Sequence, residues 1–242
     1  MNVLIVGYGV VGKHLHEEIK SLNPDIYDKK FEQDNRKDFY DIVFICVDTP
    51  YVDENNVCDI TEVRNAINEN KGYIYVIKST ILPGTTKQLR EETNKRIIHS
   101  PEYYGNTPHS NNIDFNFTIL GGVKEDCIYV QQALQEVYDA SHSFRIVDSN
   151  TAELAKYMEN CWLATKVSFC NQFYDIAEKC GVDYEDLREL FILDPRVNPS
   201  HTFVYRKHPY WDSHCLNKDV RALAYTFDAE LIKDVLKFNN KK

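Results

Sequence analysis

The first part of the chain alternates short apolar, β-branched runs with helical stretches. Continuous apolar runs of this length are typical of strands buried on both faces of a sheet. The strands are predicted at residues 2–6, 25–28, 41–47, 73–77, 96–99, 115–120 and 144–147. Helices are predicted from the glycine-rich turn to Lys20, from 59 to 70, from 83 onward and at 125–137. This order predicts an α/β fold with a doubly wound sheet of the Rossmann type.

A second part of the chain is organised around one long helical stretch, Asn150 to Cys180, which contains neither Gly nor Pro. Asn150 is expected to cap its start, with Glu153 in the capping-box position, and Gly181 to end it. Its apolar residues exceed one stripe, so we expect neighbours on several sides, including a second copy of the chain. These residues are Leu154, Tyr157, Met158, Cys161, Trp162, Leu163, Phe169, Phe173, Ile176 and Ala177.

Shorter helical stretches follow the long one, and this predicts two domains. Residues 1–148 are expected to form the dinucleotide-binding domain. Residues 149–242 are expected to form a smaller all-α domain built on the long central helix, through which the chain would form a homodimer.

A glycine-rich turn directly follows the first predicted strand and opens a helix, with the sequence Gly7-Tyr8-Gly9-Val10-Val11-Gly12. Such a turn lets backbone N–H groups approach a pyrophosphate. Asp28, at the end of the second strand, is in place to bind the ribose hydroxyls of NAD, although a solvated turn residue is the alternative. Further cofactor contacts are expected at the carboxyl ends of the next strands, from Val47, Thr49, Pro50, Ser79 and Thr80.

Composition narrows the class of protein. The 242 residues are 43% hydrophobic and 27% charged, as in ordinary soluble globular proteins, and no apolar run reaches membrane-spanning length. A net charge of −9 disfavours non-specific nucleic-acid binding. Seven cysteines without paired metal-type spacing favour reduced thiols in the cytoplasm. His201, His208, His214 and Cys215 fit no common zinc pattern, so no metal site is expected.

Lys156 and Asn160 lie four residues apart on the long helix and therefore share one face. On spacing alone, a snorkelling lysine and a hydrated asparagine explain them. Other motifs change this interpretation, because together they resemble the UDP-glucose/GDP-mannose dehydrogenase family. In chain order they are GYGVVG (7–12), FICVDTP (44–50), STILPGTT (79–86), SPE (100–102), TAELAKYMENCWLATKVSFCNQ (151–172), LDPRV (193–197) and CLNKDVRAL (215–223).

The resemblance implies oxidation of a nucleotide sugar to its uronic acid in two NAD-dependent steps. Cys215 would attack the intermediate aldehyde and later carry a thioester. Lys156 would stabilise the oxyanion, with Asn160 holding that oxygen or a water. Asp219 would orient or deprotonate water, helped by Glu102 and Thr80. Substrate contacts are expected from Glu102, Tyr103, Lys156, Asn160, Lys218 and, across a subunit boundary, Arg196.

The sequence departs from the family pattern at three places. The glycine pair that normally precedes the nucleophile is replaced by Trp211-Asp212-Ser213-His214, and the segment after Glu102 is short. The third, UDP-binding domain of the family is also missing, so we expect a short form. Two alternatives stay open: a single-step dehydrogenase of the β-hydroxyacid type, or a non-catalytic or substrate-altered NAD-binding remnant serving as a subunit or sensor.

Overall fold

The structure is a computed structural model that describes residues 1–32, 34–54, 57–104 and 115–240. The chain divides into two compact units. The first unit comprises Met1–Val52 and Cys58–Lys156, and the second comprises Asp53–Val57 and Tyr157–Lys242. The boundary between them falls inside the long helix α5 (Ser149–Cys180).

Among the described residues, the first unit contains a seven-stranded sheet with the strand order β2-β1-β3-β6-β7-β8-β9. All neighbouring strands of this sheet pair in parallel except β7 and β8, which run antiparallel to each other. The α/β prediction with a Rossmann-type sheet is confirmed. The strands are β1 (Val3–Val6), β2 (Asp25–Tyr27), β3 (Tyr40–Ile45), β6 (Gly72–Ile77), β7 (Ile97–His99), β8 (Phe117–Gly121) and β9 (Ser143–Val147). The short strands β4 (Tyr51–Val52) and β5 (Val57–Cys58) lie outside this sheet.

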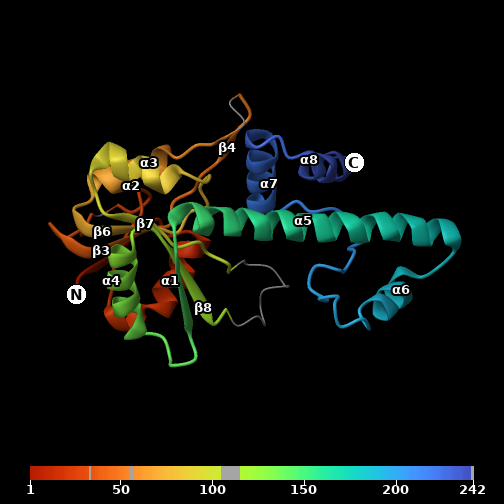
Figure 1. Cartoon of the computed structure of the whole chain (residues 1–242), viewed down its shortest axis with the longest axis horizontal. Helices are drawn as coiled ribbons and strands as arrows, with labels where there is room; N and C mark the ends of the chain where they lie inside the picture. Colours follow the sequence, from red (N-terminus) through yellow and green to blue (C-terminus); the bar gives the residue numbers. More distant parts are fainter. Residues whose placement is uncertain (33, 55–56, 105–114, 241–242) are drawn as a thin grey trace. The chain divides into compact units, whose positions relative to one another are not determined.

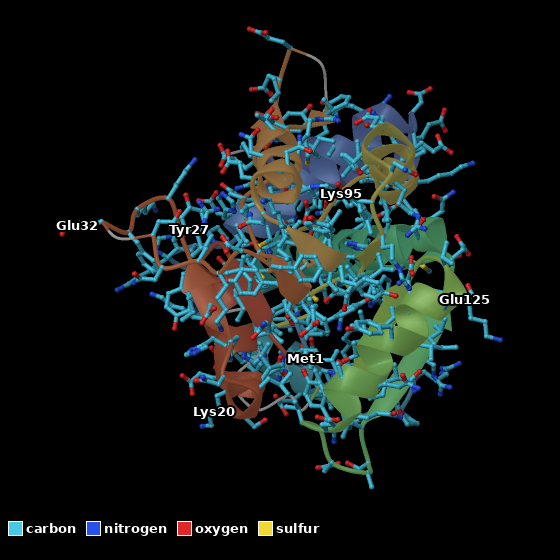
Figure 2. All side chains as sticks on the ribbon, turned by 90° about the vertical axis from the view of Figure 1, so that its left-hand side faces the viewer. Met1, Lys20, Tyr27, Glu32, Lys95 and Glu125 are labelled. Carbon is cyan, nitrogen blue, oxygen red and sulfur yellow. The ribbon has the colours of Figure 1, made fainter. Side chains whose placement is uncertain are left out.

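Alternate side chains of the strands bury two apolar layers, because successive residues of a strand point to opposite faces. On one face Ile5 and Phe44 pack with α1 (Val10–Glu18) and α4 (Lys124–Gln135). On the other face Leu4 and Val43 pack with α2 (Thr61–Glu69) and α3 (Thr85–Thr93). Figure 2 shows these two helix pairs on opposite sides of the sheet, with Lys20 marking the 3₁₀ turn (Lys20–Leu22) that follows α1.

The second unit is helical. Its stretch of α5 packs with α7 (His214–Thr226) and α8 (Glu230–Asn239) around a core that includes Trp211. Nearer its C-terminal end, α5 packs with α6 (Tyr184–Phe191) through Cys170, Ala177 and Tyr184 (Figure 1). Among the helices of the described residues, none is long and apolar enough to cross a membrane.

The start of α5 differs from the expectation in how it is capped. Asp148, not Asn150, accepts the N–H of Thr151 at 3.0 Å. Glu153 accepts the N–H groups of Gly84 and Thr86 at 2.7 and 2.8 Å, so its carboxylate serves the start of α3 instead of its own helix. The predicted capping box at the start of α5 is therefore wrong, because a long-range partner takes the carboxylate.

Candidate functional site

The glycine-rich turn joins β1 to α1. A Cβ on Gly12 would lie 2.0 Å from the carbonyl oxygen of Gly7, and Gly7 has a left-handed φ of 91°. A Cβ on Gly9 would meet nothing within 4 Å, so the space above Gly9 is open. Val10 and Val11 begin α1, whose cap provides no side-chain hydrogen bond and whose first turn has no acidic residue. The N-terminal N–H groups of α1 therefore suit an anion such as a pyrophosphate.

Asp28 follows β2 and faces this turn. Its Oδ2 accepts the backbone N–H of Tyr8 at 2.8 Å, and its Oδ1 accepts that of Lys30 at 3.0 Å. Burial alone would raise the pKa of Asp28, but the two N–H groups and the nearby charges of Lys30 and Lys29 hold it below its ordinary value. The carboxylate is thus ionised and keeps lone pairs for the two ribose hydroxyls of a dinucleotide.

The loops after β3 and β6 are tied together at the carboxyl edge of the sheet. Ser79 Oγ donates to the carbonyl of Val47 at 2.6 Å, and Thr49 Oγ1 donates to that of Thr80 at 2.9 Å. Pro50 is exposed beside them. The structure therefore brings together these five predicted cofactor contacts at one edge, where open parallel sheets hold their ligands.

Lys156 belongs to the part of α5 that lies in the first unit. Glu153, three residues earlier, anchors this part to the start of α3, and burial raises the pKa of Glu153. The Lys156 ammonium is buried and lies 4.8 Å from the ring centroid of Tyr103, a cation–π contact. Two predicted substrate contacts thus touch each other in the first unit.

Glu102 follows β7 and the adjoining Ser100-Pro101. One of its oxygens accepts the N–H groups of Tyr103 and Tyr104 at 2.9 and 2.8 Å, and the other lies 3.2 Å from the ammonium of Lys78. Burial alone would raise the pKa of Glu102, but Lys78 and the Tyr104 N–H outweigh it, so the pKa is lowered. The group is a buried carboxylate held in its charged form.

In the second unit a buried hydrogen bond joins α5 to α7. Asn160 Nδ2 donates to Asp219 Oδ2 at 2.7 Å, and the Lys218 ammonium lies 2.6 Å from Asp219 Oδ1. Asp219 is fully buried, so its charge needs both partners. Three of the predicted site residues therefore form one connected group.

Cys215 is the second residue of α7 and is exposed. Ser213 caps this helix by accepting the N–H of Leu216 at 3.2 Å. The segment before α7 begins with Trp211, whose backbone exchanges two hydrogen bonds with the side chain of Asn239. The indole N–H of Trp211 also donates to Ser168 Oγ at 3.0 Å. A buried side chain thus fixes the segment where the family has glycines.

The remaining predictions concern the other cysteines, the arginine and metals. None of the seven cysteines, all of which the structure describes, forms a disulfide, and Cys180 is exposed as Cys215 is. Cys180 ends α5, where fewer neighbours cover it. Arg196 is 88% exposed and pairs with Asp194 at 2.6 Å. Within the residues the structure describes, no group of three or more His, Cys, Asp or Glu side chains could hold a metal ion.

The sequence matches two parts of one known protein family. Residues 13–142 match the NAD binding domain, and residues 150–241 the central domain, of the UDP-glucose/GDP-mannose dehydrogenase family. The chain belongs to this family. Its cofactor is NAD, which agrees with the open space above Gly9 and the ionised Asp28.

Similar proteins include two curated relatives within the family. The chain is 28% identical to the UDP-N-acetyl-D-mannosamine dehydrogenase of Methanocaldococcus jannaschii, covering 89% of this chain and 56% of the relative. It is 27% identical to the UDP-glucose 6-dehydrogenase of Rickettsia prowazekii, over 94% of this chain and 54% of that relative. The chain therefore spans about half the length of these relatives.

The fold is also shared with a solved structure. A UDP-glucose dehydrogenase from Pyrobaculum islandicum superposes with a TM-score of 0.76 at 20% identity, over 98% of this chain and 67% of that one. At this identity the likeness supports the fold.

Sequence reasoning missed Lys78, the buried partner of Glu102, and the anchors of Trp211. Lys78 stands directly before Ser79, at the end of a strand of apolar residues. An ionisable residue at that point of a buried strand was a usable signal, because a buried cation needs an anion nearby. Ser168 and Asn239 carried no such signal, since nothing in their local sequence indicates the partner.

Proposed function

We propose that this protein oxidises the primary alcohol of a nucleotide sugar to the corresponding acid with NAD. NAD, when bound, accepts the hydride released in each of the two oxidation steps. The site residues of the first unit, Gly7 to Gly12, Asp28 and the loops after β3 and β6, would hold this cofactor. The observation that carries the proposal is the buried hydrogen bond between Asn160 and Asp219, which joins two of the expected catalytic residues on α5 and α7 within the second unit.

In the proposed reaction Cys215 attacks the aldehyde formed in the first step. Its position in the first turn of α7 supports this role, because the N–H groups there stabilise a thiolate. After the second oxidation the carbonyl carbon is a thioester on the Cys215 sulfur, and water displaces the thiolate to give the acid. The overall change consumes one water and transfers two hydrides.

Charged and polar side chains would assist the reaction steps at Cys215. Lys156 would face the oxyanion, and its cation–π contact with Tyr103 would hold the ammonium until substrate binds. Asp219 and Asn160 would position water on the thioester, and Lys218 would balance the charge of Asp219. Glu102 and Thr80 would assist the hydrolytic step from the first unit, Glu102 as an ionised proton acceptor.

We also propose a homodimer formed through α5. Exposed apolar side chains follow one face of the helix at spacings of 4, 7, 4 and 3 residues, which matches the helical repeat. This apolar stripe consists of Met158, Trp162, Phe169, Phe173 and Ile176. Exposed Arg196 would then reach the substrate of the partner subunit.

Counting cofactor per sugar tests the proposal. UDP-glucose, UDP-N-acetyl-D-mannosamine and GDP-mannose are each incubated with the protein and NAD, and NADH and sugar acid are quantified. Two NADH per acid are expected from the wild type, whereas Cys215→Ser should form no sugar acid and should still bind NAD. One NADH per sugar would instead indicate a single-step dehydrogenase. Retained NAD affinity without turnover of any sugar would indicate a non-catalytic chain.

A further inference from the structure

The side chain of Asn239, the last residue of α8, binds the backbone of Trp211 on both sides of its Cα. Asn239 Oδ1 accepts the Trp211 N–H at 3.1 Å, and Asn239 Nδ2 donates to the Trp211 carbonyl at 3.0 Å. A primary amide carries a donor and an acceptor together, so one side chain satisfies both backbone groups. Asn239 is buried, and a backbone group left unpaired beside it would be costly. The amide therefore clamps the main chain at Trp211.

The indole of Trp211 is fixed as well as its backbone. Its Nε1–H donates to Ser168 Oγ of α5 at 3.0 Å. The ring is buried in the core of the second unit, among side chains of α5, α7 and α8. Two helices thus hold Trp211, α5 through the indole and α8 through the main chain.

Trp211 stands two residues before the residue that caps α7. Ser213 Oγ accepts the Leu216 N–H at 3.2 Å, and Asp212 Oδ1 accepts a side-chain N–H of Asn217 at 3.0 Å. Both contacts join the segment after Trp211 to the first turn of α7. A shift of the main chain at Trp211 would therefore move the cap away from the turn that it closes.

Cys215 lies in this first turn and is exposed. The backbone N–H groups of the turn can stabilise a thiolate there only while the turn stays closed. Further along α7, Asp219 has its own buried partners in Asn160 and Lys218. Loss of the clamp should therefore open the turn around Cys215 and leave the rest of the helix in place.

We propose that Asn239 is a positioning residue for Cys215, and that it acts through Trp211 and the Ser213 cap. This assignment rests on the proposed function, in which the Cys215 thiolate attacks an aldehyde. Asn239 keeps the first turn of α7 closed, so that its N–H groups surround the sulfur when the thiolate forms. The reactivity of the nucleophile thus depends on a side chain of the following helix.

Alkylation of the full chain with iodoacetamide tests the proposal without substrate or cofactor. The measured quantity is the ratio of the labelling rates of Cys215 and Cys180. Asn239→Ala removes both bonds to Trp211 and should lower this ratio about two- to fivefold, the range expected when a charge loses its place at a helix start. The Leu216 amide should also exchange its hydrogen faster, because its cap is displaced. The buried cysteines report in the same sample whether the variant is folded.

Val235→Ala is the matched control. Val235 lies one turn before Asn239 on α8 and is buried in the same core, so its truncation leaves a cavity but keeps the Asn239 amide. This variant should melt at a lower temperature and retain the wild-type labelling ratio and Leu216 exchange. Asn239→Asp serves if Asn239→Ala does not fold. It has nearly the same shape, but an ionised carboxylate cannot donate to the Trp211 carbonyl, so Leu216 exchange should again be faster.

An unchanged labelling ratio in folded Asn239→Ala would overturn the proposal. An equal fall in Val235→Ala would do so too, because it would reflect a loss of stability alone. If only Asn239→Asp folds, Leu216 exchange at the wild-type rate would be the contradicting result.

Turnover provides a further readout. Asn239→Ala should slow acid formation and leave the KM for NAD unchanged, because the proposed cofactor site belongs to the first unit. Acid formation at the full rate by Asn239→Ala would refute its role in the reaction. In a wild type that oxidises no nucleotide sugar, a labelling ratio lowered by Asn239→Ala and not by Val235→Ala would support Asn239 as the positioning residue of Cys215 and refute the proposed function alone.

Discussion

Two cysteines of this chain are exposed, and they lie at opposite ends of helices. Cys215 is in the first turn of α7, whereas Cys180 is the last residue of α5. The unpaired N–H groups of a helix start favour a negative charge, and the unpaired carbonyls of a helix end disfavour it. The fold therefore places two exposed thiols in opposite electrostatic surroundings, so Cys180 can serve as the control for Cys215, while the remaining five cysteines are buried.

Brief alkylation with iodoacetamide should label Cys215 first. Because each helix end contributes about 0.3–1 kcal/mol, Cys215 should react roughly 3- to 30-fold faster than Cys180. Mass spectrometry of all seven cysteines measures both rates in one sample, and the buried thiols report whether the protein has opened. Bound NAD and substrate should slow Cys215 but not Cys180. Equal rates for the two exposed thiols would remove Cys215 as a poised nucleophile, whatever the turnover.

At the scale of elements, the sheet and the long helix could be predicted because their signals are local. Apolar runs fixed the strands within about two residues, the usual error at element boundaries, and α5 runs from Ser149 to Cys180 where Asn150 to Cys180 was expected. The partners of single side chains could not be predicted in this way. Glu153 fitted a capping box, yet it bonds to Gly84, which is 69 residues away.

Gly9 and Gly12 of the glycine-rich turn are expected to respond differently to substitution, because Gly9 faces open space and Gly12 is packed against backbone. Gly9→Val should place its side chain in open space, so the melting temperature should change little while NAD affinity falls at least tenfold. Gly12→Ala should instead drive its Cβ against the Gly7 carbonyl and destabilise the fold by roughly 1–3 kcal/mol or more. Calorimetry with NADH and thermal unfolding measure the two effects. Unchanged NADH binding in Gly9→Val would exclude a pyrophosphate above this turn.

For the whole molecule, the apolar stripe on α5 is the feature that calls for a partner. Met158 is 74% exposed and Trp162 60%, and the stripe continues to Phe173 and Ile176. The Phe169 ring also contacts Phe191 of α6, so the surface extends beyond one helix. Monomeric proteins rarely expose a continuous apolar surface of this kind. A second copy is the simplest occupant, since a two-fold axis would set this surface against itself.

Light scattering at micromolar concentration should therefore give the mass of a dimer for the wild type. Trp162→Glu should shift the protein toward the monomer, because a charge would be buried within the stripe. Glu178→Lys changes an exposed charge on the same helix outside the stripe and should leave the dimer intact. A second readout concerns Arg196, which would act on the partner's substrate. Mixing inactive Arg196→Ala with inactive Cys215→Ser should restore part of the activity, since a mixed dimer holds one intact site. A wild type that stays monomeric, or a mixture without any recovery, would remove Arg196 from the site and leave the stripe to another partner.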